Sequence, residues 1–133
     1  MSKAGETFFV AIGCMDGRVQ KPIAKLGLKE FNALFADTIT EAGLVGHLAK
    51  DLIDESLTKS ISFKMIDVSI GKHNAQGIIV HGHQECAGNP VSDEEHIDHI
   101  RKASKKIKLM VKNIPVVGAF VFRSKKGWDA KIV

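Results

Sequence analysis

Aromatic residues and cysteines are scarce in this 133-residue chain, which has no tyrosine, one tryptophan and two cysteines. With so few aromatic side chains, the stacking platforms that bind single-stranded nucleic acid are poorly supplied. Long hydrophobic runs are missing too, because none approaches the roughly 20 apolar residues that a membrane-spanning helix needs. The apolar stretch near the N-terminus is short and is interrupted by Gly13, so we expect no cleaved signal peptide. The sequence therefore predicts a cytoplasmic protein that has no membrane partner.

Positive charge is in excess, with a formal net charge of +4. Such an excess can indicate a nucleic-acid partner. The lysines, however, lie mainly in residues 102–112 and 125–131, and no aromatic residues are interleaved with them in the pattern of a nucleic-acid interface. This arrangement is typical of a solvated basic surface, and we predict no nucleic-acid partner.

The chain is long enough to bury its own hydrophobic core, and no linker or repeat divides it, so we expect a single domain over residues 1–133. Short apolar runs rich in aromatic and β-branched residues predict strands that are covered on both faces, as in a parallel sheet. The predicted strands are TFFVAIG (7–13), LFADTIT (34–40), GIIV and the residue after it (77–81), IPVVGAFVF (114–122), and a short final strand that the turn RSKKG joins into a C-terminal hairpin.

Two segments between the strands have clear helical spacing. In residues 41–57, three leucines repeat every four positions and end at Leu52. Residues 92–113 begin with Ser92 and Glu95 at the spacing of a capping box, and acidic residues occupy the first turn while lysines fill the last ones. The second segment is the strongest helix signal in the chain.

Residues 60–74 are ambiguous. Their apolar residues partly alternate, as in a strand, while Phe63, Ile66 and Ile70 fit one face of a helix that Gly71 would end. We favour the helix. Strands that alternate with helices predict an α/β fold, in which a mainly parallel sheet is flanked by helices.

Residues that can do chemistry follow two of the predicted strands. The stretch GCMDGR ends the first strand, and HGHQECAG ends the strand at 77–81. Sites in such sheets form at the carboxyl ends of the strands, so neighbouring strands would bring Cys14, His83 and Cys86 together. Two thiolates and an imidazole suit zinc and leave a fourth position open. His81 competes with His83 as a ligand, but the H-x-x-C spacing favours His83.

Asp16 and Arg18 alternate with Cys14, so in extended backbone all three side chains point the same way. An aspartate held by an arginine stays ionised and can orient a group at the metal through a hydrogen bond. A purely structural ion pair that closes the loop is the alternative for these two residues. For Cys14 taken alone, the alternative is a small buried hydrophobic residue.

Together these motifs resemble the β-class carbonic anhydrases, whose signature is C-x-D-x-R in one loop and H-x-x-C in another. The layout is similar as well, with a strand before each motif, a helix after the second and a closing hairpin. The resemblance implies zinc (Zn²⁺) as the cofactor, a homodimer or higher homo-oligomer, and roles for the matching residues. It implies Cys14, His83 and Cys86 as metal ligands, and Asp16 and Arg18 as the catalytic pair beside the metal.

Three departures indicate a compact, divergent branch of that family. Typical members have an N-terminal helical arm, whereas only about six residues precede the first predicted strand here. They carry a substrate-binding glutamine before the first motif, and no glutamine precedes Cys14. Where they have a segment like RNAG, this chain has TEAG, residues 40–43. The metal-binding residues are therefore retained, while the residues around the substrate differ.

The resemblance implies a carbonic-anhydrase-like lyase (carbonate dehydratase) that hydrates carbon dioxide reversibly to bicarbonate with a zinc-bound hydroxide. One alternative is hydrolysis of a related small molecule, carbonyl sulfide or carbon disulfide. Another is a non-catalytic zinc-binding or regulatory protein on the same fold. The other histidines lack motif context, and we expect solvent-facing positions for His47, His73, His96 and His99.

Overall fold

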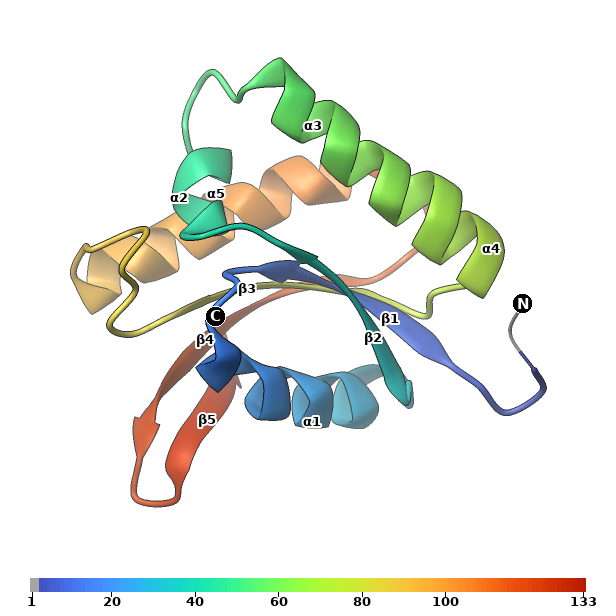
Figure 1. Ribbon diagram of the computed structural model, residues 1–133, viewed down its shortest axis with the longest axis horizontal. Coiled ribbons are helices and arrows are strands. Elements are labelled where there is room, and N and C mark those ends of the chain that lie inside the picture. The colour runs from blue at the N-terminus through green and yellow to red at the C-terminus, as the bar shows by residue number, and fades with distance from the viewer. Residues whose placement is uncertain (1–2) are drawn as a thin grey trace.

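In the computed structural model, which describes residues 3–133, a five-stranded sheet runs through the middle of the molecule (Figure 1). Its strand order is β2-β1-β3-β4-β5, and the first four strands are parallel while β5 is antiparallel to β4. The strands are β1 (Phe8–Gly13), β2 (Phe35–Thr40), β3 (Ile78–His83), β4 (Val116–Ser124) and β5 (Gly127–Ile132). The predicted α/β fold and its C-terminal hairpin are thus confirmed.

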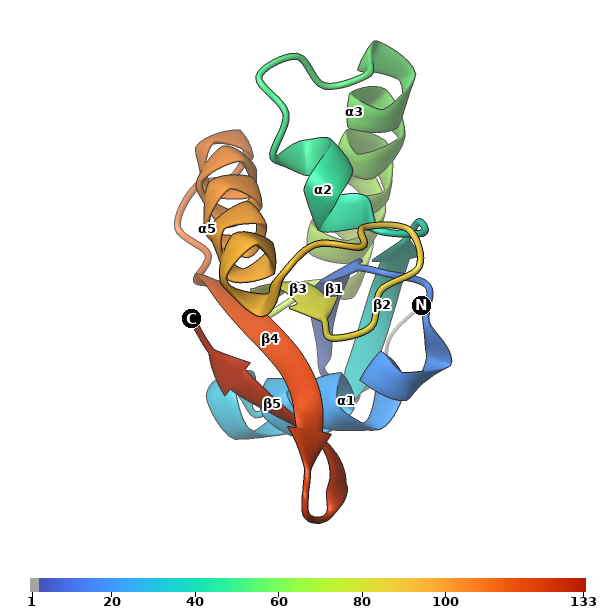
Figure 2. The same ribbon diagram turned by 90° about the vertical axis from the view of Figure 1, so that its left-hand side faces the viewer.

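Helices cover both faces of the sheet (Figures 1 and 2). A short 3-10 turn and helix α1 lie on one face, and the other helices lie on the opposite face. None of the helices in residues 3–133 is both long and apolar enough to cross a membrane. The helical elements are η1 (Gly17–Val19), α1 (Gln20–Phe31), α2 (Leu44–Leu48), α3 (Glu55–Ser62), η2 (Phe63–Ile70), α4 (Gly71–His73) and α5 (Asp93–Met110).

The continuous apolar run of β1 supplies both layers of the core. Phe9 and Ala11 face α1, while Val10 and Ile12 face the helices on the other side, and all four are buried. Side chains alternate between the faces of a strand, so an uninterrupted apolar run fits a strand that has helices on both sides. This explains why the run predicted a parallel sheet.

The predicted helix at 92–113 is confirmed as α5. The Ser92 hydroxyl caps it by accepting a hydrogen bond from the Glu95 amide at 3.2 Å. The helical prediction for 41–57 is correct only at its two ends, because α2 ends at Leu48 and α3 starts at Glu55. Leu52 lies between them and is 90% exposed. The leucine spacing therefore predicted a continuous helix across a segment that is a loop.

Residues 60–74 are helical, as favoured, but the buried positions differ from those expected. Ile61 and Met65 are buried, whereas Phe63 is 58% exposed. The middle of the segment, η2, is a π-helix, so a 3.6-residue period does not describe its faces. The helix passes through Gly71 and ends at Asn74, whose φ of 53° is in the left-handed region.

Helix α1 was not predicted from the sequence. Its buried residues Ile23, Leu26 and Gly27 follow helical spacing, but Pro22 and Gly27 weaken the pattern. Gly27 is required by packing, because a Cβ there would overlap the ring of Phe9 on β1. Proline fits near the start of the helix, where its missing N–H costs little. Helix α1 thus packs close against the sheet through Gly27, although glycine usually disfavours a helix.

Candidate metal centre

The two motifs meet because β1 and β3 are parallel neighbours, with Ile12 paired to Val80. Cys14 follows the end of β1, His83 is the last residue of β3, and Cys86 lies in the loop after it. Their candidate ligand atoms all lie within 4.8 Å of one another, and all three residues are buried. The prediction that these residues come together is confirmed, and no other His, Cys, Asp or Glu cluster of this kind occurs within residues 3–133.

The spacing of the two sulfur atoms fits a tetrahedral zinc ion. Cys14 Sγ lies 3.8 Å from Cys86 Sγ. Two sulfur ligands that are each about 2.3 Å from a tetrahedral zinc ion lie about 3.8 Å apart. The sulfur pair therefore needs no rearrangement to hold such an ion.

The orientation of the His83 ring also fits a metal ligand. Its Nδ1 lies 2.6 Å from the carbonyl oxygen of Gln84, and since a carbonyl only accepts, Nδ1 donates the hydrogen. Nε2 then carries the lone pair, and it is buried with no hydrogen-bond partner in the described chain. A buried polar atom without a partner is costly, and a metal ion would satisfy it. These donors fit zinc.

The two thiols differ in acidity. Burial acts to raise the pKa of Cys14, but the neighbouring His83 side chain and hydrogen bonds from the Gly43 and Asp16 amides outweigh it and lower the pKa to about 7. For Cys86, burial and the neighbouring Cys14 sulfur raise the pKa. One thiolate therefore forms readily near neutral pH, and the second needs a cation to stabilise it.

Two loops touch backbone to backbone at the centre. The Gly43 amide, in the TEAG segment, donates to Cys14 Sγ at 3.4 Å. Gly43 has a φ of 62°, and a Cβ there would overlap the backbone of Gly88, two residues after Cys86. Glycine at position 43 thus allows the loop after β2 to approach the loop that carries Cys86 and to place a hydrogen-bond donor on the Cys14 sulfur.

Asp16 and Arg18 form a bidentate pair. Arg18 Nε donates to Asp16 Oδ1 at 3.0 Å and Nη2 donates to Oδ2 at 2.8 Å, while the Arg18 amide also donates to Oδ1 at 2.9 Å. The Arg18 hydrogen bonds lower the pKa of Asp16 to about 2. Asp16 Oδ2 lies 3.8 Å from His83 Nε2, so the ionised carboxylate borders the centre.

The predicted reason for this pairing was wrong, because the backbone is not extended beyond Asp16. Residues 17–19 form the 3-10 turn η1, and Asp16 is its N-cap. The turn brings the Arg18 amide and guanidinium back toward one carboxylate. Aspartate at an N-cap accepts such amide bonds readily, and this provides the structural cause of the pair.

Arg18 has further partners that the sequence did not indicate. Its Nη2 donates to the Glu85 carbonyl at 3.2 Å, its Nη1 lies 3.5 Å from Glu85 Oε1, and its guanidinium lies 4.8 Å from the Trp128 ring centre. Arg123 pairs with Glu85 and also contacts Trp128, which it faces across the β4–β5 hairpin. The register of this hairpin brings Trp128 to Arg18, and the amino-acid composition does not reveal that register.

A hollow of about 310 Å³ opens beside Cys14 and Asp16 on the α1 side of the sheet. His81 lines it and is 2% exposed, and its Nδ1 is buried without a hydrogen-bond partner in the described chain. Burial, with a smaller contribution from His83, lowers the pKa of His81 to about 3, so the ring is neutral. The remaining lining is mostly small or apolar: Ala11, Met15, Val19, Gln20, Ile23, Ala24, Ala36, Thr38 and Thr40.

Gly13 makes room for His81, because a Cβ at position 13 would overlap the imidazole ring. A third histidine, His96, is also inside the molecule, against the expectation. His96 is 2% exposed and packs on Gly82 from the opposite face of the sheet. Its position in the first turn of α5 faces β3, so its lack of motif context did not make it solvent-facing.

These features define a class of protein: an α/β protein whose parallel strands bring a Cys-His-Cys centre and an Asp-Arg pair to one edge of the sheet. Residues 4–133 match the family described as "Putative carbonic anhydrase", and the chain belongs to this carbonic anhydrase family.

Solved structures share the fold. The carbonic anhydrase from Streptococcus mutans is 20% identical with a TM-score of 0.59, over 100% of this chain and 87% of that one. The β-carbonic anhydrase CafA of the fungal pathogen Aspergillus fumigatus is 16% identical with a TM-score of 0.51, over 95% and 76% of the two chains. At these identities the likeness concerns the fold alone. No curated protein sequence matches the chain.

Proposed function

We propose that this protein is a zinc-dependent carbonic anhydrase that hydrates carbon dioxide reversibly to bicarbonate, with Cys14, His83 and Cys86 as the metal ligands. The observation that supports this most is the match between the 3.8 Å sulfur separation and a tetrahedral site, with the unpartnered Nε2 of His83 beside it. A zinc ion held there would supply a water whose pKa is lowered toward about 7.

Asp16 orients the attacking water in this proposal. Its carboxylate is ionised at any pH near neutrality, because Arg18 holds its pKa at about 2, and it borders the centre through Oδ2. A carboxylate only accepts hydrogen bonds, so it turns a water hydrogen toward itself and a lone pair toward the substrate. Arg18 acts through Asp16 and is a positioning residue.

The small apolar side chains of the adjoining hollow provide the surface against which carbon dioxide lies. Ala11, Val19 and Ala36 carry no polar side-chain atoms that would compete for the water. An apolar gas gains by leaving water for such a surface, whereas the charged product does not. The hollow therefore favours entry of carbon dioxide and release of bicarbonate.

Asp16→Asn tests the catalytic proposal. The asparagine is nearly isosteric but can also donate, so we expect the rate of carbon dioxide hydration to fall at least about 100-fold while bound zinc is unchanged. Stopped-flow assays at several pH values measure the rate. Since the pKa of Asp16 is about 2, protonation of this residue causes no loss of wild-type activity between neutral pH and about pH 5.

Asp51→Asn is the matched control, because Asp51 is exposed and lies outside the centre. It should leave the rate unchanged. A zinc-loaded wild type with no rate above background would contradict the catalytic proposal and favour the non-catalytic zinc-binding alternative. Release of sulfide from carbonyl sulfide, without carbon dioxide hydration, would instead identify the related hydrolase.

His81 has the burial and the free nitrogen of a substrate-binding residue. A neutral imidazole has one donor and one acceptor, and hydrogen bonding to a substrate oxygen in the hollow would satisfy it. We expect His81→Phe to raise the KM for bicarbonate up to about tenfold, the cost of one neutral hydrogen bond. His81→Gln should recover part of this loss, whereas equal KM values in both variants and the wild type would rule out the contact.

A homodimer and a cytoplasmic location stay predictions. Light scattering on the purified zinc-loaded protein tests the first, and cell fractionation tests the second.

A further inference from the structure

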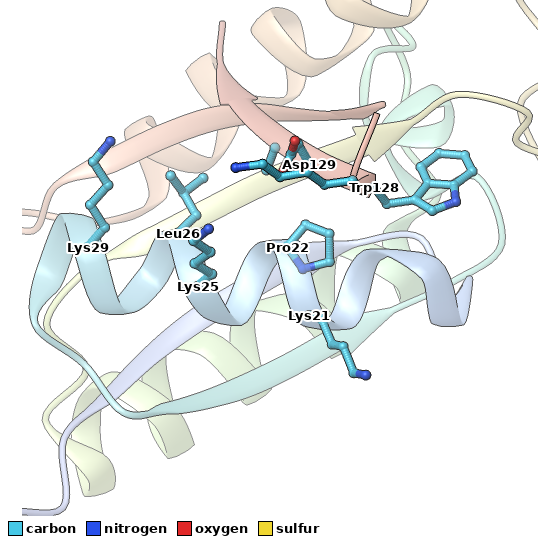
Figure 3. A pocket seen from close by; sticks show the side chains of 9 residues that line it. Lys21, Pro22, Lys25, Leu26, Lys29, Trp128 and Asp129 are labelled. Carbon is cyan, nitrogen blue, oxygen red and sulfur yellow. The ribbon is translucent and has the colours of Figure 1, made fainter. Parts of the chain in front are cut away.

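A second hollow, of about 400 Å³, lies between α1 and the β4–β5 hairpin, and shares no lining residue with the hollow beside Cys14 (Figure 3). Its floor is largely apolar, formed by Pro22, Leu26, Trp128 and Ala130. Its charged residues are four lysines and one acid: Lys21, Lys25, Lys29, Lys126 and Asp129. Figure 3 shows the three lysines of α1 spaced along the helix, with Lys29 directed toward the hairpin and Lys21 directed away from it. We call this hollow the lysine groove.

The lysines of the groove lack counter-charges. None of the four forms a salt bridge with a residue in the described part of the chain. Two lysines on other helices do pair, Lys59 with Glu55 at 3.2 Å and Lys102 with Asp98 at 3.0 Å. Most other lysines of the described chain lack such a partner as well, but only these four line one hollow together, with a single acid among them.

The spacing of these lysines works against the helix that carries them. Lys21, Lys25 and Lys29 lie four positions apart, so that each Cα lies about 6 Å further along the helix axis than the one before. Like charges at this spacing destabilise a helix. Asp129 alone opposes four positive charges in the groove, so a bound anion would relieve the repulsion.

We propose that the lysine groove binds a small anion that carries two or more phosphate groups, such as an inorganic oligophosphate or a nucleoside polyphosphate. Lysine binds phosphate as a point charge, and a row of lysines matches a row of phosphates rather than a single one. A volume of about 400 Å³ falls in the range of small-molecule sites. A concave groove of this size suits a compact ligand better than a flat membrane surface.

The chain's single tryptophan lines the groove and reports on binding. The purified protein is titrated with inorganic tripolyphosphate and, separately, with ATP, and Trp128 fluorescence is followed. Titration calorimetry runs in parallel, so that binding which leaves the fluorescence unchanged is still detected. We expect saturable binding that weakens as salt rises from about 50 to about 200 mM. If tripolyphosphate binds, the phosphate chain is sufficient for recognition. If ATP binds more tightly than tripolyphosphate, the groove also contacts the nucleoside.

The variant Lys25→Gln/Lys29→Gln removes two charges from α1, and glutamine is as good a helix former as lysine. We expect affinity for tripolyphosphate to fall at least tenfold. The matched control is Lys105→Gln/Lys108→Gln, which removes the same charge from exposed positions on α5 and should change affinity less than about twofold.

Equal weakening in the two double variants would overturn the proposal, because net charge alone would then explain binding. So would the absence of saturable binding, or binding to anionic phospholipid vesicles that competes with and exceeds binding of both soluble phosphates. None of these outcomes depends on carbon dioxide hydration, so the groove and the metal centre are tested separately.

Discussion

Replacing Cys86 by serine is expected to reduce bound zinc from about one ion per chain to less than about a tenth of that. The variant removes one of the two sulfur atoms that lie 3.8 Å apart. A serine hydroxyl stays protonated at neutral pH, so it offers neither the charge nor the soft donor that zinc takes from a thiolate. Elemental analysis of protein purified in reductant measures the metal content, and carbon dioxide hydration should be lost with the zinc.

The two neighbouring histidines provide a matched comparison for the metal centre. His83→Phe should lose zinc as Cys86→Ser does, while His81→Phe should keep it, because only His83 belongs to the Cys-His-Cys cluster. Both residues are buried on the same face of β3, so the change in volume and burial is alike. Zinc retained in His83→Phe, or lost equally in both variants, would contradict the ligand assignment.

Gly43→Ala is expected to lower the free energy of unfolding by at least about 2 kcal/mol and to weaken zinc binding about 10- to 100-fold. Alanine is strained at a φ of 62°, and its Cβ would overlap the backbone of Gly88. Separating the two loops also draws the Gly43 amide away from Cys14 Sγ, which now accepts its hydrogen bond at 3.4 Å. Urea unfolding measures the stability, and a chelator competition measures the zinc affinity.

Gly17→Ala is the control for Gly43→Ala. Gly17 begins the neighbouring 3-10 turn η1, but its φ is not positive and no atom lies within 4 Å of the position its Cβ would take. Alanine there should change the stability by less than about 0.5 kcal/mol. If the two variants behaved alike, the close approach of the loops at Gly43 would have no part in shaping the centre.

Much of the candidate site could be predicted because its residues follow buried strands directly. Cys14 comes right after β1 and His83 ends β3, so the topology of a parallel sheet is enough to bring them together. The residues that hold Arg18 could not be found in this way. Trp128 contacts Arg18 because of the register of the β4–β5 hairpin, and Glu85 contacts it from a loop position whose φ is 57°. Neither feature can be read from the sequence pattern.

The fold was predicted best where periodicity and capping agreed, as in α5. It was predicted worst in α1, where a proline and a glycine hid a helix that packing requires, and around Leu52, where leucine spacing extended across a loop. Both errors concern residues whose role depends on what lies opposite them. The local sequence pattern reflects only the secondary-structure propensity of each residue. The contact between Gly27 and Phe9 forms only when helix α1 packs on the sheet.

Cys14 and Cys86 are 72 positions apart in the chain, and they meet only when β3 has paired with β1. Closing so long a loop costs several kcal/mol of chain entropy, which makes this contact a late event in folding. An ion shared by the two sulfurs would therefore be captured after the central strands have formed. Separation of β1 from β3 would in turn break the centre, so loss of the sheet and loss of the metal would be linked.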